Sequence, residues 1–581
     1  MGSDFSPEQK RYLEGFVSGF SASRLTPRKA TAEPVGPDAI HIKAQDRVLA
    51  SGGKLSDQEK IKRDEHPFDA YPRLVQQAAD NQAPKPADNF RWRYYGLFYV
   101  APTQTSYMCR LRIPNGVLKH WQFAGLADVA EKLAAPYAHV TTRANLQLRE
   151  IEPKNAALLV EAIQDLGLCS RGSGADNIRN VTGTPTAGID PQELLDTRPH
   201  ARAWHFHILN DRSLYGLPRK FNVAFDGAGR IAVLEETNDI AFQAVEVLPG
   251  HGLEPGIYYR LALGGITGHK DFARDTGIVV RPEEAVEVAD RIVRVFIEHG
   301  DRTNRNKSRL KYVLDAWGFQ KFIAAVEEKL GRPLMRAPVD AVAPRPSFDK
   351  LAHIGVHPQK QPGLNWIGVT LRLGRLSPEQ IRGLSRIAAD HGDGDIRLTV
   401  WQNLLISGVA DADVTDVCAQ IEALGLSTTA TPIRAGLVAC TGASGCRFAG
   451  AHTKETADAI AAWCEPRVAL DQAINIHLTG CHHSCAQHYI GDIGLIGARV
   501  PVNDEGDTVE GFHLLVGGGY GADPKIAREL AQNIRTEDVP RAIERILAAY
   551  MSERASPDET FADFSGRVEI ARLPQLADLV P

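Results

Sequence analysis

Residues 140–148 read "VTTRANLQL", and residues 398–406 read "LTVWQNLLI". At an offset of 258 positions the two stretches share three residue types, in the pairs Thr141 and Thr399, Asn145 and Asn403, and Leu146 and Leu404. At the same offset Gly116 falls on Gly374, and a third pair, "LGGITG" (263–268) and "VGGGYG" (516–521), follows in the same order. Matches that recur in order along the chain predict an internal duplication.

Each half of the duplication has the same expected order of elements. A strand-rich unit with a helix comes first, and a second unit of strands and helices ends in a Gly-Gly-x-x-Gly turn. The sequence therefore predicts an α+β fold with mixed α/β units, in which the two halves form a pseudo-twofold molecule. A cleft between such halves is a favoured place for a cofactor.

Length, composition and charge exclude several classes of protein. The chain has 581 residues, 43% of them hydrophobic, which is enough for about three or four domains. Its formal net charge of -5 argues against a nucleic-acid-binding protein. We find no apolar run of about 18 residues and no signal-peptide pattern at the start, so we expect no membrane segment and a cytoplasmic location.

Four of the eight cysteines form two pairs. They are Cys440 and Cys446 in "ACTGASGC", and Cys481 and Cys485 in "TGCHHSC". The first half carries Thr182 at the place of Cys440, so the duplicated scaffold has one cysteine-bearing copy. From this spacing an iron-sulfur cluster is the favoured interpretation, while zinc and no metal remain open. His482 and His483, which lie within the second pair, keep a Cys/His zinc site possible.

Basic residues recur in several segments. In "DRTNRNKSRLKYVLDAWG" (301–318) a helix would place Arg302, Arg305 and Arg309 on one face. Other cations and polar residues stand in "YMCRLRIPNG", "DNIRNVTG" and "LPRKFNV", namely Arg110, Arg112, Arg179, Arg219, Lys220 and Asn222. A solvated surface is the ordinary interpretation of each segment taken alone. Together they indicate a cofactor or substrate rich in negative charge.

These residues taken together resemble the siroheme-dependent assimilatory nitrite and sulfite reductases. The resemblance covers roughly residues 65–560 and rests on "CRLRIPNG", "VTTRANLQL", "DNIRNVTGTPTAGID", "LPRKFN", "RTNRNKSRLKY" and the cysteine pairs. It implies two ferredoxin-like half-domains, at 89–158 and 345–425, and two siroheme and cluster α/β domains, at 159–335 and 430–560. An N-terminal helical arm and linker (1–88), with a helical pattern at 6–23, and a C-terminal tail (561–581) complete the expected domains.

The resemblance also implies the cofactors and the residues that hold them. A [4Fe-4S] cluster would be bound by Cys440, Cys446, Cys481 and Cys485, and the siroheme iron would share the Cys485 thiolate. Siroheme carries eight carboxylates, for which Arg143, Arg305 and Arg309 are the expected partners, with hydrogen bonds from Thr141 and Gln147. Beside the substrate the family pattern places Arg110, Arg179, Lys220 and Asn222, whose cations would neutralise the anion and relay protons.

The implied reaction is the six-electron reduction of nitrite to ammonia. Family members that reduce sulfite to sulfide usually have K-x-K where this chain has Lys220 and Asn222, and one cation fewer suits a monoanion better than a dianion. Some sulfite-reducing members also carry Cys at the position of Asn177. Sulfite reduction is therefore the second hypothesis, and a non-catalytic zinc-stabilised module is the distant one.

The sequence departs from the family pattern at two places. His139 stands where the family has an Arg, which puts one siroheme carboxylate contact in doubt, and "CHHSC" replaces the commoner Cys-Pro-Asn-Ser-Cys.

The resemblance implies a separate electron donor, a ferredoxin or similar small protein, that docks on a local basic patch. We expect a monomer.

Overall fold

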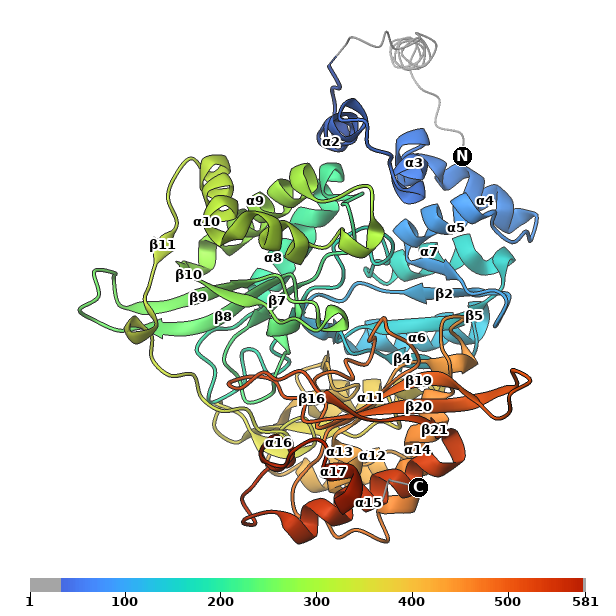
Figure 1. Ribbon diagram of the computed structural model, residues 1–581, viewed down its shortest axis with the longest axis vertical. Coiled ribbons are helices and arrows are strands. Elements are labelled where there is room, and N and C mark those ends of the chain that lie inside the picture. Colours follow the sequence, from blue (N-terminus) through green and yellow to red (C-terminus); the bar gives the residue numbers. More distant parts are fainter. Residues whose placement is uncertain (1–32, 578–581) are drawn as a thin grey trace.

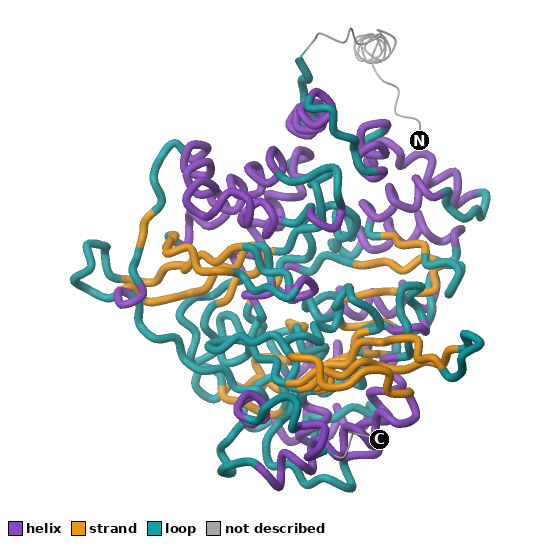
Figure 2. The backbone as a smooth tube through the Cα atoms, viewed as in Figure 1, coloured by secondary structure: helices purple, strands orange, loops and turns teal. Residues whose placement is uncertain are grey.

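The computed structural model describes residues 33–577, with the two described ends on opposite sides of the molecule (Figure 1). The helical pattern expected at residues 6–23 lies outside the described residues. Strands run through the middle of the molecule, and helices cover them above and below (Figure 2). The expected α+β architecture is confirmed, with four sheets and their helices.

Two of the sheets are antiparallel and correspond to the expected half-domains. The first has the order β1-β2-β5-β4-β14, and the second has the order β12-β13-β16-β15-β3. Their strands are β1 (Leu97–Tyr99), β2 (Tyr107–Arg110), β5 (Leu146–Ile151), β4 (Ala138–Val140) and β14 (Arg375–Leu376), then β12 (Gly355–Pro358), β13 (Leu364–Val369), β16 (Leu404–Ala410), β15 (Asp395–Leu398) and β3 (Val117–Lys119). The helices are α6 (His120–Leu133) and α7 (Ala156–Asp165), then α11 (Pro378–His391) and α12 (Val414–Ala423).

The two half-domains exchange their edge strands. Strand β3 lies between β2 and β4 along the chain, both of which belong to the first sheet, but it pairs with β15 of the second sheet, with Val117 opposite Arg397. Strand β14 makes the equivalent exchange in the other direction, with Arg375 opposite His139. Both pairings are related by the offset of 258 residues seen in the sequence. The duplication is therefore a structural one, and each sheet is completed by its neighbour.

Two equivalent glycines make this exchange possible. Gly116 and Gly374 lie just before β3 and β14 with φ of +70° and +75°. A Cβ on Gly116 would lie 2.6 Å from the Leu398 carbonyl oxygen, and a Cβ on Gly374 would lie 2.5 Å from the Val140 carbonyl oxygen. Both distances are below any real Cβ contact, so glycine is needed for the backbone conformation and for the close approach of the other half.

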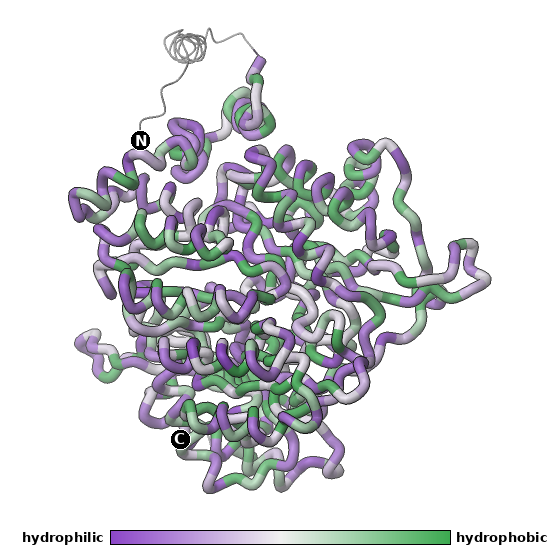
Figure 3. The backbone as a smooth tube through the Cα atoms, turned by 180° about the vertical axis from the view of Figure 1, so that it is seen from behind, coloured by the Kyte–Doolittle hydropathy of each residue, from purple (hydrophilic) through white to green (hydrophobic). Residues whose placement is uncertain are grey.

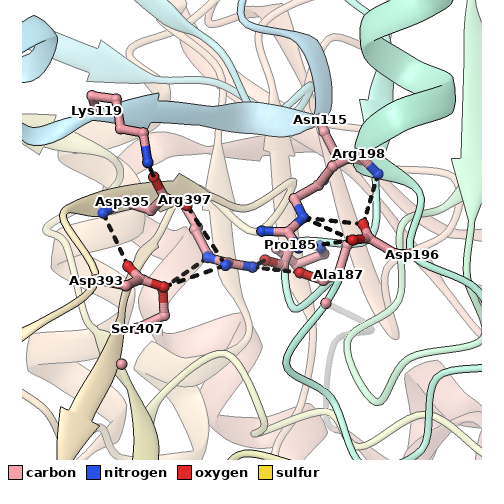
Figure 4. Close-up of polar contacts among 12 residues, drawn as sticks. Asn115, Lys119, Pro185, Ala187, Asp196, Arg198, Asp393, Asp395, Arg397 and Ser407 are labelled. Atoms are coloured by element: carbon pink, nitrogen blue, oxygen red, sulfur yellow. Dashed lines mark hydrogen bonds and ion pairs between the residues drawn. The ribbon is translucent and has the colours of Figure 1, made fainter.

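A buried arginine ties β15 to the first α/β unit. Arg397, at 0% exposure, donates through Nε to the Ser407 hydroxyl at 2.9 Å and through Nη1 to the Ala187 carbonyl at 2.7 Å (Figure 4). The Ser407 hydroxyl donates in turn to Asp393, and Lys119 of β3 is paired with Asp395 of β15. This network contacts both half-domains and the loop after β6, so it fixes their relative positions.

The other two sheets have matching mixed topologies. Their orders are β11-β10-β9-β8-β7-β6 and β17-β18-β19-β20-β21, and in each the three lowest-numbered strands are parallel while the later ones are antiparallel. The strands are β6 (Thr182–Gly183), β7 (Val223–Asp226), β8 (Ile240–Val247), β9 (Gly256–Leu263), β10 (Arg274–Val280) and β11 (Met335–Arg336), then β17 (Leu437–Ala439), β18 (Ile476–Thr479), β19 (Ile493–Pro501), β20 (Thr508–Val516) and β21 (Arg528–Arg535).

Helices cover these sheets on their outer faces (Figure 1). The first sheet is covered by α8 (Arg198–Asn210), α9 (Ala285–His299) and α10 (Leu310–Leu330). The helices of the second unit are α13 (Pro432–Ala435), α14 (Thr453–Cys464), α15 (Val539–Glu553), α16 (Phe561–Arg567) and α17 (Leu573–Leu576). Phe561, Phe564 and Leu573, which belong to the expected C-terminal tail, are buried in the core of this unit.

The described part of the N-terminal arm is helical, with α2 (Ala39–Ala50), α3 (Asp57–Asp64), α4 (Tyr71–Ala79) and α5 (Pro86–Trp92). Hydrophobic and hydrophilic residues alternate along the helices (Figure 3). Within residues 33–577 we find no helix with the length and apolar character needed to cross a membrane.

The expected helix over 301–318 is wrong for its first nine residues. Helix α10 begins at Leu310, and before it the Asp301 and Asn304 side chains accept hydrogen bonds from the backbone N–H groups of Thr303 (2.6 Å) and Asn306 (3.0 Å). The Asp301 bond belongs to a turn, and the Asn304 bond caps a short 3₁₀ helix at Arg305–Lys307, so the segment is divided before α10 begins. Arg302 is buried and paired with Glu59 of the arm at 2.6 Å, so it does not share a face with Arg305 and Arg309.

We predict that Gly374→Ala destabilises the protein by about 2 kcal/mol more than Gly331→Ala. Both glycines have a positive φ, which costs about 1–2 kcal/mol with a Cβ. Only at Gly374 would the new Cβ also meet a backbone oxygen, and overpacking adds about 1–3 kcal/mol, while Gly331 has open space. The measurement is chemical denaturation followed by circular dichroism. Equal losses in the two variants would contradict the role of Gly374 in the strand exchange.

Candidate functional site

The two cysteine pairs follow neighbouring parallel strands. Cys440 comes directly after β17, and Cys481 comes two residues after β18, which pairs in parallel with β17. The carboxyl ends of parallel strands lie at the same edge of a sheet, where α/β proteins place their ligands. The loop following each strand therefore brings its cysteine pair to the same place, although 34 residues separate Cys446 from Cys481.

Glycines bring these two loops into contact. The Gly480 N–H lies 3.2 Å from Cys440 Sγ, and the Gly450 N–H donates to the Gly480 carbonyl at 2.7 Å. A Cβ on Gly480 would lie 2.6 Å from the Ala449 Cβ. A side chain at position 480 would thus separate the loops that carry the two cysteine pairs.

The four thiols influence one another electrostatically. Burial raises the pKa of Cys440 to about 11 and that of Cys481 to about 12, and in both cases the neighbouring Cys485 raises the pKa further. Cys485 is exposed, whereas the other three are partly buried, and none of the four forms a disulfide. Four free thiols at one edge of a sheet, with backbone N–H groups beside the sulfurs, fit a [4Fe-4S] cluster. A bound metal would hold the thiols deprotonated.

The predicted substrate cations gather at the opposite edge of the other parallel pair. Arg179 comes shortly before β6 and Lys220 shortly before β7, and the Arg179 N–H donates to the Phe221 carbonyl at 2.8 Å. The Arg179 guanidinium donates to the Ala175 carbonyl at 2.7 Å. Asn222 is held through its backbone N–H, which donates to Asp239 at 2.8 Å, and its side chain makes no hydrogen bond to another described residue.

The turn between β4 and β5 joins the cations to the cysteine loops. Arg143 in this turn donates to the Asn180 carbonyl and to Asn238 Oδ1, both at 2.9 Å. Its neighbour Thr142 donates to the Cys485 carbonyl at 2.8 Å. Thr141 lies at the start of the turn, where its hydroxyl accepts from the Arg143 N–H at 3.3 Å. Residues predicted from distant parts of the sequence are therefore brought together around Cys485.

The site holds more positive charge than its protein surroundings balance. Burial lowers the pKa values of Arg143 and Arg219 to about 10, and nearby arginines lower them further, while Asp239 raises that of Arg143 and Asp176 that of Arg219. Burial and the neighbouring Arg309 lower the pKa of Lys220 to about 7, while Cys485 raises it. Within residues 33–577, neither Lys220 Nζ nor the Arg110 guanidinium makes a hydrogen bond or ion pair, and Arg110 lies over the Phe98 ring at 5.0 Å.

This excess of charge is a test of the expected cofactor. Arg143 Nε is buried without a hydrogen-bond partner, and so are Nε and Nη2 of Arg112. Buried cations and unsatisfied donors are costly unless an anion meets them. A group with several carboxylates would supply what these residues lack, so the residues present fit siroheme.

Two of the predicted carboxylate partners already hold protein carboxylates. Arg305 makes a two-point ion pair with the buried Asp176 at 2.7 and 2.8 Å. Arg309 donates to the buried Asp239 at 2.7 and 3.2 Å. These ion pairs fix the positions of both arginines. Among the described residues, Arg110, Lys220 and Arg219 have no such carboxylate partner and are more available to bind a cofactor carboxylate or the substrate.

A polar cavity of about 550 Å³ lies beside the loop that follows Cys440. It is lined by His139, Arg149, Arg375, Thr441 and Lys454, among others. His139 is 7% exposed, and neither of its ring nitrogens has a hydrogen-bond partner; burial lowers its pKa to about 2. The position where the family carries an Arg is therefore a neutral imidazole in this chain, with cations of other elements beside it.

Arg149 and Lys454, which line this cavity, were not among the site residues predicted from the sequence. Arg149 stands two residues after Gln147 on β5, contacts the Gln147 amide oxygen at 3.5 Å and donates to the Gly445 carbonyl at 2.6 Å. The period-two pattern of the strand could have found it, because residues 147 and 149 face the same side. Lys454 lies in the first turn of α14, and its pKa is lowered to about 8 by burial. No sequence pattern points to it.

The chain matches two family models along most of its length. Residues 174–334 and 434–570 match the nitrite and sulphite reductase 4Fe-4S domain. Residues 99–166 and 357–424 match the nitrite/sulfite reductase ferredoxin-like half domain. Each model matches twice, once in each half of the duplication.

Relatives and a solved structure agree with these matches. The chain is 33% identical to a ferredoxin--nitrite reductase of Synechococcus elongatus, over 86% of this chain and 98% of that protein. It is 36% identical to a ferredoxin--nitrite reductase of Leptolyngbya laminosa, over 80% of this chain and 90% of that protein. The solved structure of the Mycobacterium tuberculosis NirA protein superposes with a TM-score of 0.83 at 29% identity and covers 90% of this chain and 99% of that one.

We predict that Gly480→Ala lowers the iron content of the purified protein at least several-fold. The added methyl group would meet Ala449 and separate the two cysteine loops. Gly566→Ala is the matched control, because a Cβ there meets nothing within 4 Å. Iron and acid-labile sulfide per chain are the measurements. Full iron in Gly480→Ala would show that the loops do not need this contact to hold a cluster.

Proposed function

The chain belongs to the nitrite and sulphite reductase family, and we propose that it reduces nitrite to ammonia with electrons from a ferredoxin. The observation that carries the proposal is the meeting of four free thiols with an unbalanced group of cations at one place in the fold. The relatives that are named ferredoxin--nitrite reductase support both the substrate and the donor.

Four cysteines and several cations would hold the cofactors. Cys440, Cys446, Cys481 and Cys485 would hold a [4Fe-4S] cluster, and Cys485, which raises the pKa values of Arg110 and Lys220, would be the thiolate on the side of the cations and of siroheme. Arg143, Thr141 and Gln147 on the β4–β5 hairpin would bind siroheme carboxylates, and Arg305 and Arg309 would do so only through the guanidinium N–H groups that their pairs with Asp176 and Asp239 leave free. When bound, the coupled pair supplies the iron that takes the substrate and the route for six electrons.

The chain's own residues bind the anion and supply protons. Arg110, Arg179 and Lys220 attract nitrite and stabilise the negative charge that develops on its oxygens. Lys220 Nζ is a candidate proton donor, because it is buried beside other cations without a hydrogen bond to a described residue, and burial and Arg309 lower its pKa to about 7. Arg179 is held by two backbone carbonyls, so it contributes a fixed charge.

Asn222 favours nitrite over sulfite. A lysine at this position would add a charge beside Lys220, and two adjacent cations suit a dianion better than a monoanion. The asparagine side chain leaves one ammonium group in front of the substrate. Because the family model covers nitrite and sulphite reductases alike, sulfite reduction is the second candidate function.

The substrate preference is tested by the ratio of turnover rates with nitrite and sulfite at matched concentrations. We predict that the wild type reduces nitrite faster, and that Asn222→Lys lowers this ratio by about tenfold, as expected for one charge contact of about 1.4 kcal/mol. Reduced ferredoxin or a chemical reductant serves as donor for both proteins. Faster turnover of sulfite by the wild type would overturn the nitrite assignment.

The shared thiolate is tested by Cys485→Ser. We predict a loss of nitrite reduction of at least about 100-fold, together with loss of the spectroscopic coupling between siroheme and cluster, because the bridge between them is removed. Cys418→Ser is the matched control, since Cys418 lies on α12 away from the cysteine pairs. The absorption and electron paramagnetic resonance spectra are recorded with the rates. Full activity of Cys485→Ser would mean that another ligand forms the bridge.

A further inference from the structure

One histidine of the cysteine loop contacts a cysteine sulfur. His483 Nδ1 lies 3.4 Å from Cys481 Sγ. The other polar contacts to the four sulfurs come from backbone N–H groups and from the Thr453 hydroxyl, which donates to the Cys440 carbonyl at 2.7 Å. In the described part of the chain, His483 is thus the one side-chain nitrogen within hydrogen-bond distance of the four sulfurs.

The orientation of the His483 ring is supported by its neighbours. Its ring centre lies 5.2 Å from that of Phe448 at an angle of 72°, an edge-to-face contact. Arg447 in turn stacks over Phe448 at 4.8 Å. Phe448 is 56% exposed, so its ring forms the outer side of this stack. His483 and the adjacent His482 are both exposed, but His482 has no such contact with a described residue.

The direction of the hydrogen bond follows from the chemistry of the sulfur. A cysteine sulfur bound to iron carries no proton and can only accept, so the imidazole Nδ1–H must donate. Reduction of a cluster adds negative charge to its sulfurs, and a hydrogen bond to a more negative acceptor is stronger. Donors to the sulfurs therefore favour the reduced state, and their number is one of the factors that set the reduction potential.

We propose that His483 raises the reduction potential of the cluster by donating a hydrogen bond from Nδ1 to Cys481 Sγ, and that Phe448 holds the imidazole in place for this bond. His483 is a positioning and tuning residue, since it acts through Cys481. The residue makes the cluster easier to reduce by the electron donor. In the commoner motif, Cys-Pro-Asn-Ser-Cys, an asparagine stands at the position of His483. Both side chains carry an N–H group that can donate a hydrogen bond to the cluster.

The inference rests on the cluster of the proposed function. Iron and sulfide analysis of the wild type therefore comes first: a chain without the cluster would overturn the proposed function, whereas a chain with the cluster leaves the role of His483 to be decided by the potential. The measurement is a redox titration of the holoenzyme followed by electron paramagnetic resonance of the reduced cluster, and it does not depend on nitrite turnover.

Three variants separate the hydrogen bond from other effects. His483→Phe keeps an aromatic ring against Phe448 and removes the N–H, His483→Asn keeps a side-chain N–H, and His482→Phe makes the same change at the neighbouring exposed histidine. At a fixed potential we expect the ratio of reduced to oxidised cluster to fall by about tenfold in His483→Phe, which for a one-electron couple is about 59 mV. We expect less than half of this shift in His483→Asn and no shift in His482→Phe.

Several outcomes would overturn the proposal. A wild-type potential in His483→Phe, or an equal shift in His482→Phe, would show that no specific hydrogen bond sets the potential. If His483→Phe does not retain its iron, the wild type decides: with ¹⁵N-labelled histidine, electron-nuclear double resonance of the reduced cluster should show a ¹⁵N coupling and an exchangeable proton. Absence of this histidine coupling in the wild type would also overturn the proposal.

Discussion

The strand exchange between the half-domains is the constraint on which the site depends. Because β3 completes the second sheet and β14 completes the first, neither half can move relative to the other without breaking backbone pairing. The β4–β5 turn lies within this exchange: the Val140 N–H donates to the Gly374 carbonyl at 2.8 Å, and the turn begins at the next residue. From this fixed point Thr142 reaches the Cys485 carbonyl and Arg143 reaches the segment before β6. The cofactor contacts proposed for the turn are therefore held by a segment that the strand exchange fixes in place.

The same rigidity lets the fold hold charges that it does not neutralise. Arg110, Arg143, Arg179 and Lys220 stand close enough for each to be influenced by other cations or by Cys485, and the protein carboxylates nearby, Asp176 and Asp239, are already paired with Arg305 and Arg309. Such an arrangement is unfavourable by itself, because buried like charges repel and lose hydration. A bound polyanion reverses the sign of these interactions. The free energy of its binding then adds to the stability of the folded chain, so cofactor loading and folding are expected to be coupled.

The sequence predicted those features of the structure that appear as recognisable motifs or repeats. The duplication, the four-cysteine set and the segments that carry Arg110, Arg179 and Lys220 could be recognised from spacing and resemblance, and the duplication reappears as two pairs of matching sheets. It could not predict the ion pairs of Arg305 with Asp176 or of Arg309 with Asp239, because the partners are 129 and 70 residues away. Helical spacing also failed for Arg302, since it lies outside α10 and outside the short 3₁₀ helix that Asn304 caps at Arg305–Lys307, and tertiary pairing with Glu59 decides its position.

The two halves use equivalent sheets for opposite chemistry. In the second half the cysteines follow the carboxyl ends of β17 and β18, where glycine N–H groups approach sulfur and small side chains leave room for a cluster. In the first half the cations precede the amino ends of β6 and β7, where backbone carbonyls fix the Arg179 guanidinium. A duplicated scaffold thus provides one edge that suits thiolates and metal, and another that suits an anion. The turn that carries Thr142 and Arg143 contacts both groups of residues, so the two copies differ in their side chains rather than in their fold.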